Sequence, residues 1–498
     1  MRATLTKRDA SRFKAWQAGL LALVLALAFG MIHPGASWGA SAYDPTNDPY
    51  SMRAITAADG AQSWWDAGDT GQGVDVALID TGVAPVPALS GDNKIVNGAD
   101  LSFESQDPSL QYLDTNGHGT FIAGIIGGND GQPGGYRGVA PDSRILSVKV
   151  GAANGAVDVS QVIAAVDWVV EHRHDNGMNI RVINISYGTD STQPFMVDPL
   201  AYAFERARRA GIVVVTAAGN TGIGSGLADP AYDPWLISVG AANTEGTPSM
   251  SDDQPASFSA GASCTGSFTM RCRAPDLLAP GVHMQGLRDP GSYIDQNNPN
   301  AALGDQYFRG SGTSEAAAYV TGAVALLLQK YPQLTPGQVK QMLDESADYL
   351  AGYAASSQGA GELDLNALLA DDPPNRASQP YFPSFGTGSL EAARGSNHLS
   401  LGGVVLQGNQ DIFGQPFNSA RMAFLEAMGS SWSGGTWNGS SWSGSSWSGN
   451  SWSGSSWSGS SWSGNSWDGS SWSGSSWSGS DWSGSSWSGD GWLVASWG

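Results

Sequence analysis

Short apolar runs alternate with amphipathic stretches from about Gly73 to Leu369. The runs are apolar on both faces, which is typical of strands in a parallel sheet that helices cover on both sides. The sequence therefore predicts an α/β domain of three layers, with a parallel sheet covered by helices. The expected strands are 74–79, 145–150, 182–186, 212–216 and 236–240, and the expected helices are one through Trp64 and Trp65, one that starts at 121, 159–174, 201–210, 314–330 and 335–346.

Residues 371–429 break this pattern. Four prolines stand between 373 and 383, and proline cannot continue a helix or a central strand. We therefore interpret residues 41–370 as the α/β domain and 371–429 as a linker, with a small strand pair around 401–406.

The tail, residues 430–498, repeats a unit of five residues. Tryptophan stands at every fifth position from Trp432 to Trp497, mostly within Ser-Ser-Trp-Ser-Gly. This low-complexity composition of serine, glycine and tryptophan cannot build an ordinary core. Two interpretations stay open. One is a flexible extension whose indoles contact polysaccharide, the cell surface or one another; the other resembles a pentapeptide-repeat β-helix.

The N-terminus has the composition of an export signal. Basic residues from Arg2 to Lys14 precede the apolar run Ala18–Ile32, and small residues follow at 36–40. This order is typical of a signal peptide, so we assign residues 1–40 to it and expect a secreted protein. The apolar run is short for a membrane span, and retention as an uncleaved anchor is the alternative.

Charge and cysteine content narrow the class of protein. The formal net charge of −21 disfavours binding to nucleic acid, because like charges repel. The chain has two cysteines, Cys264 and Cys272, which can pair outside the cell and close a small loop. One disulfide does not make a scaffold, so the hydrophobic core must carry the stability.

Separate motifs supply an acid, a base and a nucleophile. Asp80 ends the first strand, His118 stands between glycines, and Ser314 opens a long helix. Histidine is the usual general base near neutral pH, and a helix N-terminus favours developing negative charge. Asn220 offers a side-chain amide to the same charge. Each residue alone has a structural explanation as a turn or cap residue, so the prediction rests on their combination.

The segments around these residues resemble the signature segments of the subtilisin-like serine peptidases. The chain order Asp, His, Ser separates this family from the two other common orders of a serine triad. The resemblance covers roughly residues 44–369 and implies the fold of that family and a serine endopeptidase. The matching segments are Asp80-Thr81-Gly82-Val83, Gly117-His118-Gly119-Thr120, Ala218-Gly219-Asn220 and Gly312-Thr313-Ser314.

The resemblance implies a role for each matched residue. Asp80 would orient His118, which would take the proton of Ser314 during attack on a peptide carbonyl. Asn220 and the Ser314 N–H would form the oxyanion hole. An extended substrate would bind between two segments. These segments are Ser186, Tyr187 and Gly188 on one side, and residues 217–219, with Ala218 and Gly219, as a wall of the specificity pocket.

The chain departs from the family pattern at positions that do no chemistry. Ala318 and Tyr319 stand where a proline and a histidine-like residue are usual, and Phe121 stands where a second histidine is usual. We therefore expect a less kinked helix after the nucleophile. About 40 residues separate the assigned signal from Asp80, and on this spacing we expect no folding prodomain.

The resemblance implies no cofactor for catalysis. Relatives often bind structural calcium, and a site would lie in the glycine-rich segment 127–138, near Asn129 and Asp130. The segment lacks a dense set of carboxylates, so a calcium site and a plain glycine loop both fit. We interpret the protein as a monomeric secreted endopeptidase that acts on proteins or peptides. The alternative is a surface-binding or structural protein whose tail carries the role and whose peptidase domain serves its maturation.

Overall fold

The structure is a computed structural model. It describes residues 43–105, 107, 109–263, 272–377, 379–401 and 404–443, and short tail strands at 446–448, 456–458, 461–462, 471–473 and 496–497. Residues 1–40, which were assigned to an export signal, lie outside this description, as does Cys264. Cys272 is disulfide-bonded. Within the described part of the chain, no helix is long and apolar enough to cross a membrane.

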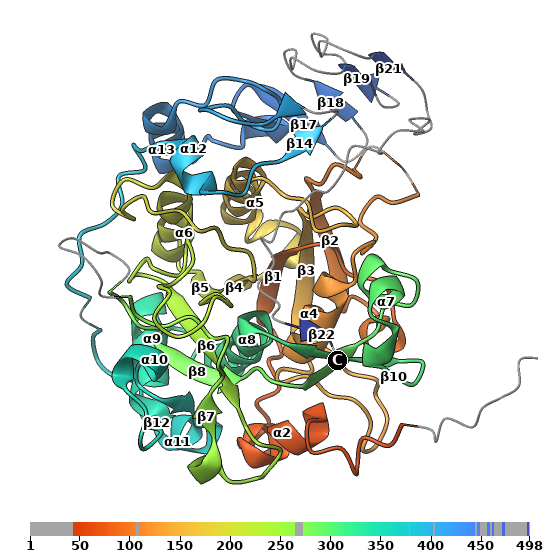
Figure 1. The fold of residues 1–498 in the computed structure, drawn as a ribbon, viewed down its shortest axis with the longest axis vertical. Helices are drawn as coiled ribbons and strands as arrows, with labels where there is room; N and C mark the ends of the chain where they lie inside the picture. The colour runs from red at the N-terminus through yellow and green to blue at the C-terminus, as the bar shows by residue number, and fades with distance from the viewer. Residues whose placement is uncertain are drawn as a thin grey trace, which may run out of the picture. The chain divides into compact units, whose positions relative to one another are not determined.

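A ten-stranded, mostly parallel sheet carries the predicted strands (Figure 1). Its order is β12-β13-β8-β6-β5-β4-β1-β3-β2, with β7 paired to β6. β12 and β7 are antiparallel to their neighbours, and the other pairs are parallel. The strands are β1 (Asp75–Asp80), β2 (Ile95–Asp100), β3 (Arg144–Lys149), β4 (Ile180–Ile185), β5 (Val213–Ala217), β6 (Ile237–Asn243), β7 (Gln254–Pro255), β8 (Leu277–Pro280), β12 (Ala347–Asp348) and β13 (Glu362–Leu363).

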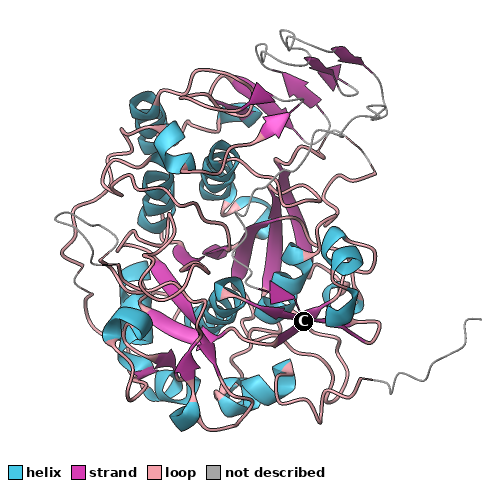
Figure 2. Cartoon of the chain, viewed as in Figure 1, coloured by secondary structure: helices cyan, strands magenta, loops and turns pink. Residues whose placement is uncertain are grey.

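Helices cover both faces of the sheet, as predicted (Figures 1 and 2). Alternate residues of β1 divide the two cores, because successive strand side chains point to opposite faces. Val76 and Leu78 pack with α4 and α8, whereas Ala77 and Ile79 pack with α5 and α6. The helices are α2 (Met52–Ala58), α3 (Ala61–Ala67), α4 (His118–Gly127), α5 (Val159–His172), α6 (Pro199–Arg209), α7 (Tyr293–Asn297), α8 (Thr313–Lys330), α9 (Pro336–Ser346), α10 (Ala355–Gln358) and α11 (Leu365–Ala370).

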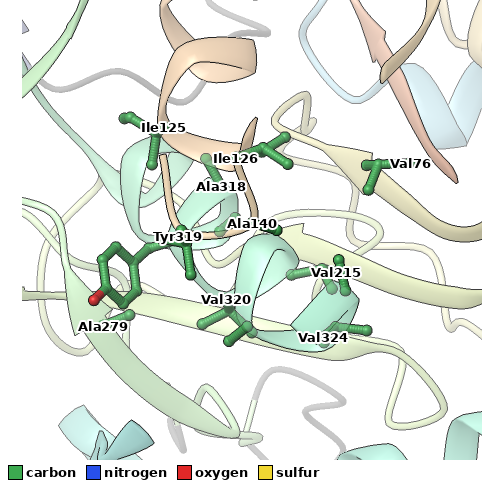
Figure 3. Close-up of a cluster of buried hydrophobic side chains, with 14 of the residues drawn as sticks. Val76, Ile125, Ile126, Ala140, Val215, Ala279, Ala318, Tyr319, Val320 and Val324 are labelled. Atoms are coloured by element: carbon green, nitrogen blue, oxygen red, sulfur yellow. The ribbon is translucent and has the colours of Figure 1, made fainter. Parts of the chain in front are cut away.

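The long helix α8 lies within the core. It is unbroken over 18 residues, which confirms the expectation of a helix without a proline kink. Figure 3 shows Val320 and Val324 of α8 among side chains from the sheet, including Val76 and Val215. Ala318 and Tyr319, at the two departures from the family pattern, are fully buried. A helix that is apolar all round must be buried in this way, and this burial fixes the position of its N-terminus.

A smaller antiparallel sheet leads into α8. Its strands are β9 (Met284–Leu287), β10 (Ala302–Leu303), β11 (Tyr307–Ser311) and β22 (Ser496–Trp497). β11 ends two residues before the first residue of α8 and pairs with β9 on one side. Gly310 and Ser311 also pair with Trp497 and Ser496 of the tail.

The segment after residue 370 is not a linker. Residues 390–437, which we call the C-terminal segment, pack apolar side chains against α5 and α6. The structure confirms the expected strand pair, β14 (Ser400–Leu401) with β15 (Val404–Val405), but the interpretation of 371–429 as a linker was wrong. The further elements of the segment are α12 (Leu390–Arg394), α13 (Ser419–Ala427) and β16 (Thr436–Trp437). Its buried apolar residues are Leu390, Ala393, Leu399, Leu406, Ile412, Phe413, Phe417, Met422, Ala423, Trp432 and Trp437.

The first two tryptophans of the repeat belong to this core. Trp437 is fully buried beside Phe417, and its indole N–H donates to Asp167 of α5 at 3.1 Å. The described strands from β16 to β21 pair in two ways. β16, β17 (Ser440–Ser443) and β18 (Ser446–Ser448) are antiparallel neighbours, whereas β18 pairs in parallel with β20 (Ser461–Trp462), and β19 (Ser456–Ser458) pairs in parallel with β21 (Ser471–Ser473).

Candidate active site

The predicted acid lies at the carboxyl end of the central strand. Asp80 is the last residue of β1, which has parallel neighbours on both sides, and the carboxyl edge of such a sheet is where functional side chains gather. Its side chain is buried, and its Oδ1 accepts a hydrogen bond of 2.7 Å from the Thr81 N–H. The backbone therefore holds this carboxylate in one orientation.

The predicted base is the first residue of α4. Gly117 precedes it at a φ of 101°, a conformation that favours glycine. His118 Nδ1 lies 2.7 Å from Asp80 Oδ1, and both side chains are only 1% exposed. Gly119 is needed for this approach, because a Cβ there would lie 2.0 Å from the carbonyl oxygen of Gly82. The glycines that flank the histidine thus set the acid and the base in contact.

The predicted nucleophile is in the first turn of α8. Ser314 is buried, and its Oγ lies 3.5 Å from the carbonyl oxygen of Ser186. The free N–H groups of a helix N-terminus stabilise negative charge. The helix α4, which begins at His118, packs against α8, which holds Ser314 in its first turn. The structure thus brings the three predicted residues into one neighbourhood.

Asn220 is oriented for donation. Its Oδ1 accepts hydrogen bonds of 3.0 Å from both the N–H and the Oγ1 of Thr313. Its Nδ2 is buried and has no partner among the described residues. A buried donor without a partner is costly. The residue that Asn220 contacts, Thr313, directly precedes Ser314 in the sequence. The Nδ2 of Asn220 is available to an oxygen that develops charge on a ligand.

The electrostatics of His118 suit a base. Burial lowers its pKa, but the charge and hydrogen bond of Asp80 outweigh burial, and Glu315 and Asp114 add to the effect, so the pKa is raised above the ordinary value. The imidazole therefore gains a proton readily, and it becomes protonated and unable to accept one at a higher pH than a free histidine.

Asp114, which was not predicted from the sequence, joins the segments that hold the acid and the base. Its Oδ1 accepts from Thr81 Oγ1 at 2.8 Å and from the Gly117 N–H at 2.8 Å. Its Oδ2 accepts from the N–H and Oγ1 of Thr120 at 2.7 and 2.6 Å. One buried carboxylate therefore ties the end of β1 to the start of α4. Asp114 stands four residues before the histidine. Because loop aspartates usually cap turns locally, this position did not indicate its role from the sequence alone.

The sequence analysis also missed Glu315. It follows the nucleophile directly, is buried, and has no hydrogen-bond partner for either oxygen in another described residue. A carboxylate in the first turn of a helix is ordinary, so the sequence alone does not single it out. An acidic residue inside an apolar helix was the available signal.

The predicted substrate segments flank Ser314. Ser186, Tyr187 and Gly188 follow β4, and the Tyr187 side chain is buried in the core, so only its backbone could face a ligand. Ala218 and Gly219 follow β5. The backbone of Ala218 is already bonded to Val239 and Ala228, and Gly219 is bonded through its N–H to Thr313 Oγ1 at 3.1 Å.

The predicted calcium loop is held by its own hydrogen bonds. Asn129 Oδ1 accepts from Gly131 N–H, and the Asp130 oxygens accept from the N–H groups of Gln132 and Tyr136. Over the residues that the structure covers, no group of three or more histidine, cysteine, aspartate or glutamate side chains could hold a metal ion.

Comparison with known proteins identifies the class. A model of the subtilase family matches residues 71–362. The subtilisin of Bacillus pumilus is 34% identical over 324 residues, which cover 64% of this chain and 98% of that protein. The chain belongs to the subtilase family.

Two further relatives show how far the similarity extends. The serine protease AprX of Bacillus subtilis is 38% identical over 299 residues, 59% of this chain and 65% of AprX, so the match spans less than two thirds of that relative. The crystal structure of fervidolysin from Fervidobacterium pennivorans, a keratinolytic enzyme related to subtilisin, superposes with a TM-score of 0.51 at 26% identity, over 67% of this chain and 48% of that one.

Proposed function

We propose that the protein is an exported serine endopeptidase that cleaves peptide bonds through an acyl-enzyme on Ser314. The observation that carries this proposal is the buried contact of 2.7 Å between His118 Nδ1 and Asp80 Oδ1, next to the helix turn that holds Ser314. Membership of the subtilase family supports it.

In the first half of the reaction, Asp80 holds the Nδ1 proton of His118, which leaves Nε2 to accept the Ser314 Oγ proton. Oγ attacks the scissile carbonyl carbon, and the carbonyl oxygen becomes an oxyanion. Asn220 Nδ2 and the Ser314 N–H stabilise that charge. The intermediate collapses when His118 returns the proton to the leaving amine, which departs with its half of the peptide.

In the second half, water replaces the amine. His118 takes a proton from the water, whose oxygen attacks the acyl carbon, and the second oxyanion occupies the same donors. Collapse breaks the ester bond to Oγ and returns the proton to Ser314. No cofactor is needed for either half.

The finer parts of the proposal concern substrate and location. An extended protein or peptide chain would lie between residues 186–188 and 217–219, with Ala218 and Gly219 beside the side chain at the cleaved bond. Export would follow from the basic and apolar residues of 1–40. The indole-rich tail would contact cell-surface or polysaccharide partners, and a variant lacking residues 444–498 that is still retained on cells would argue against that contact.

A fluorophosphonate probe tests the reaction. It should label wild-type protein at Ser314, and Ser314→Ala should lose labelling and about 10⁶-fold in kcat, as removal of the nucleophile does in subtilisin. Ser251→Ala, at an exposed serine far from the site in sequence, is the control and should keep both. Labelling of another residue, or full peptidase activity in Ser314→Ala, would contradict the proposal.

A further inference from the structure

An acidic side chain directly follows the nucleophile and does not belong to the Asp, His, Ser triad. Glu315 lies in the first turn of α8 and is completely buried. Neither of its carboxylate oxygens has a partner in another described residue. A buried carboxylate normally has partners for its oxygens, because its desolvation is costly without them. Glu315 therefore needs an explanation beyond packing.

The groups that act electrostatically on Glu315 come from two elements. His118 at the start of α4 has the opposite charge when protonated, and Asp80 at the end of β1 has the same charge. Burial raises the pKa of Glu315 to about 7, although His118 opposes this. His118 also contacts Asp80 at 2.7 Å, and the charge of Asp114, from the loop before α4, acts on it as well. Since α4, which begins at His118, packs against α8, which holds Glu315 in its first turn, the two charged groups act on each other through a buried and weakly screened region.

We propose that Glu315 is a positioning residue that tunes the base of the triad, with its carboxylate stabilising the imidazolium of His118 across the nucleophile turn. This inference rests on the proposed function, in which His118 must be neutral to accept the Ser314 proton. An ionised Glu315 keeps His118 protonated to a higher pH, so it moves the acid limb of activity upward. It also stabilises the imidazolium that forms during attack. Above neutral pH this gain offsets part of the activity that is lost because some His118 is still protonated.

Glu315→Gln is the decisive variant, because it keeps the shape and removes the charge. The pH dependence of kcat/KM on a peptide substrate should shift its acid limb down by about 0.5–1 unit. Glu315→Met, which fills the space without polar atoms, should give a similar shift. If Glu315→Gln leaves the limb in place while Glu315→Met moves it, the residue acts through packing, and the proposal is wrong.

A second readout does not depend on peptidase activity. The titration midpoint of the His118 imidazole, followed by NMR in the full chain carrying Ser314→Ala, should fall when Glu315→Gln is added. An unchanged midpoint overturns the proposal even if the enzyme is active. A lowered midpoint, together with a chain that lacks peptidase activity when it keeps Ser314, would leave the interaction of the two charges standing and overturn the proposed function instead.

Glu315→Gln should fold, because it removes a buried carboxylate whose charged form is costly to desolvate. The pKa of Glu315 is raised in the folded state, so the native form binds the proton more tightly, and stability falls as pH rises from the unfolded value near 4.3 through about 7. Glu315→Gln has no such loss. Its thermal midpoint above pH 7 should equal or exceed that of the wild type, and a clear decrease would show that the carboxylate has a structural partner.

Discussion

Two buried charge pairs at helix N-termini have opposite characters. His118 and Asp80 meet at the start of α4, and Arg394 of the C-terminal segment meets Asp158 at the start of α5. The side chains are 1% exposed in the first pair and 0% in the second. The distances are also alike, 2.7 and 2.6 Å. Burial and distance therefore do not tell the two pairs apart.

The two pairs differ in how many of their polar atoms have hydrogen-bond partners. Both oxygens of Asp158 are bonded to Arg394, and Oδ2 also accepts from the N–H of Ser160. The guanidinium donates further to the carbonyl oxygens of Gly408 and Gln410. By contrast, Asp80 Oδ2 has no partner among the described residues.

The rest of the first neighbourhood shares this character. Asn220 Nδ2 and both oxygens of Glu315 are also without a described partner in another residue. A saturated pair fixes structure, whereas a neighbourhood with free polar atoms is prepared for a ligand. Polar atoms without hydrogen-bond partners, more than burial or charge, therefore distinguish the candidate active site from the structural pair.

Removal of the whole C-terminal segment should unfold the protein. A chain that ends at residue 370 leaves α5 and α6 without Ile412, Phe413 and Phe417, which are buried against them. Each such side chain contributes about 1.5–3 kcal/mol, and three of them approach the total stability of a domain, about 5–15 kcal/mol. This chain should be insoluble or unfolded.

The matched control is a chain that ends at residue 443. It keeps the C-terminal segment and loses most of the repeat, including the two residues of β22 that pair with β11, so its thermal midpoint should lie close to that of the full chain. If both shortened chains melt like the full one, residues 390–437 are not part of the core, and the comparison between the two regions fails.

Arg394→Met tests the saturated pair itself. It leaves Asp158 buried without its partner, and breaking a buried pair in this way costs about 3–5 kcal/mol. Arg288→Met is the control, because Arg288 forms an ion pair of the same 2.6 Å with Asp295 but both side chains are partly exposed, 22% and 10%. It should cost less than about 1 kcal/mol. Urea unfolding measures both, and equal losses would mean that burial does not set the strength of the pair.

The two regions also differ in what the sequence could predict. The sheet and α8 followed from apolar runs whose physical requirements are local, and the Asp80–His118 contact followed from the resemblance of the motifs around these residues to those of a known family. The C-terminal segment did not, because α12 and α13 are short, prolines precede them, and short helices depend on tertiary packing. Arg394 and Asp158 are 236 residues apart, and a pair of that separation leaves no periodic signal.

At the candidate site, too, the residues that could not be predicted from the sequence are those whose role depends on tertiary contacts. Asp114 and Glu315 act through contacts that the fold creates, and each has an ordinary local explanation as a turn or helix-cap residue. Trp432 and Trp437 were assigned to the repeat because their spacing matches it, yet they are buried in the core. The packing around these two tryptophans, and not the five-residue period of the sequence, makes them core residues.

A smaller loss, in catalysis and not in stability, is expected at the candidate active site. Asn220→Ala removes the unpartnered Nδ2 and should lower kcat by about 10²–10³, or about 2.7–4 kcal/mol in the barrier, with little change in KM. The reason is that the lost hydrogen bond forms only when the carbonyl oxygen becomes charged. Thr313 loses an acceptor as well, so Asn220→Asp is the companion variant. It keeps an acceptor for the Thr313 N–H but has no donor, and should be at least as impaired. Steady-state kinetics separates the outcomes. A rise in KM at constant kcat would reassign Asn220 to substrate binding, and normal kinetics in both variants would show that an unpartnered buried donor does not mark the reacting site in this protein.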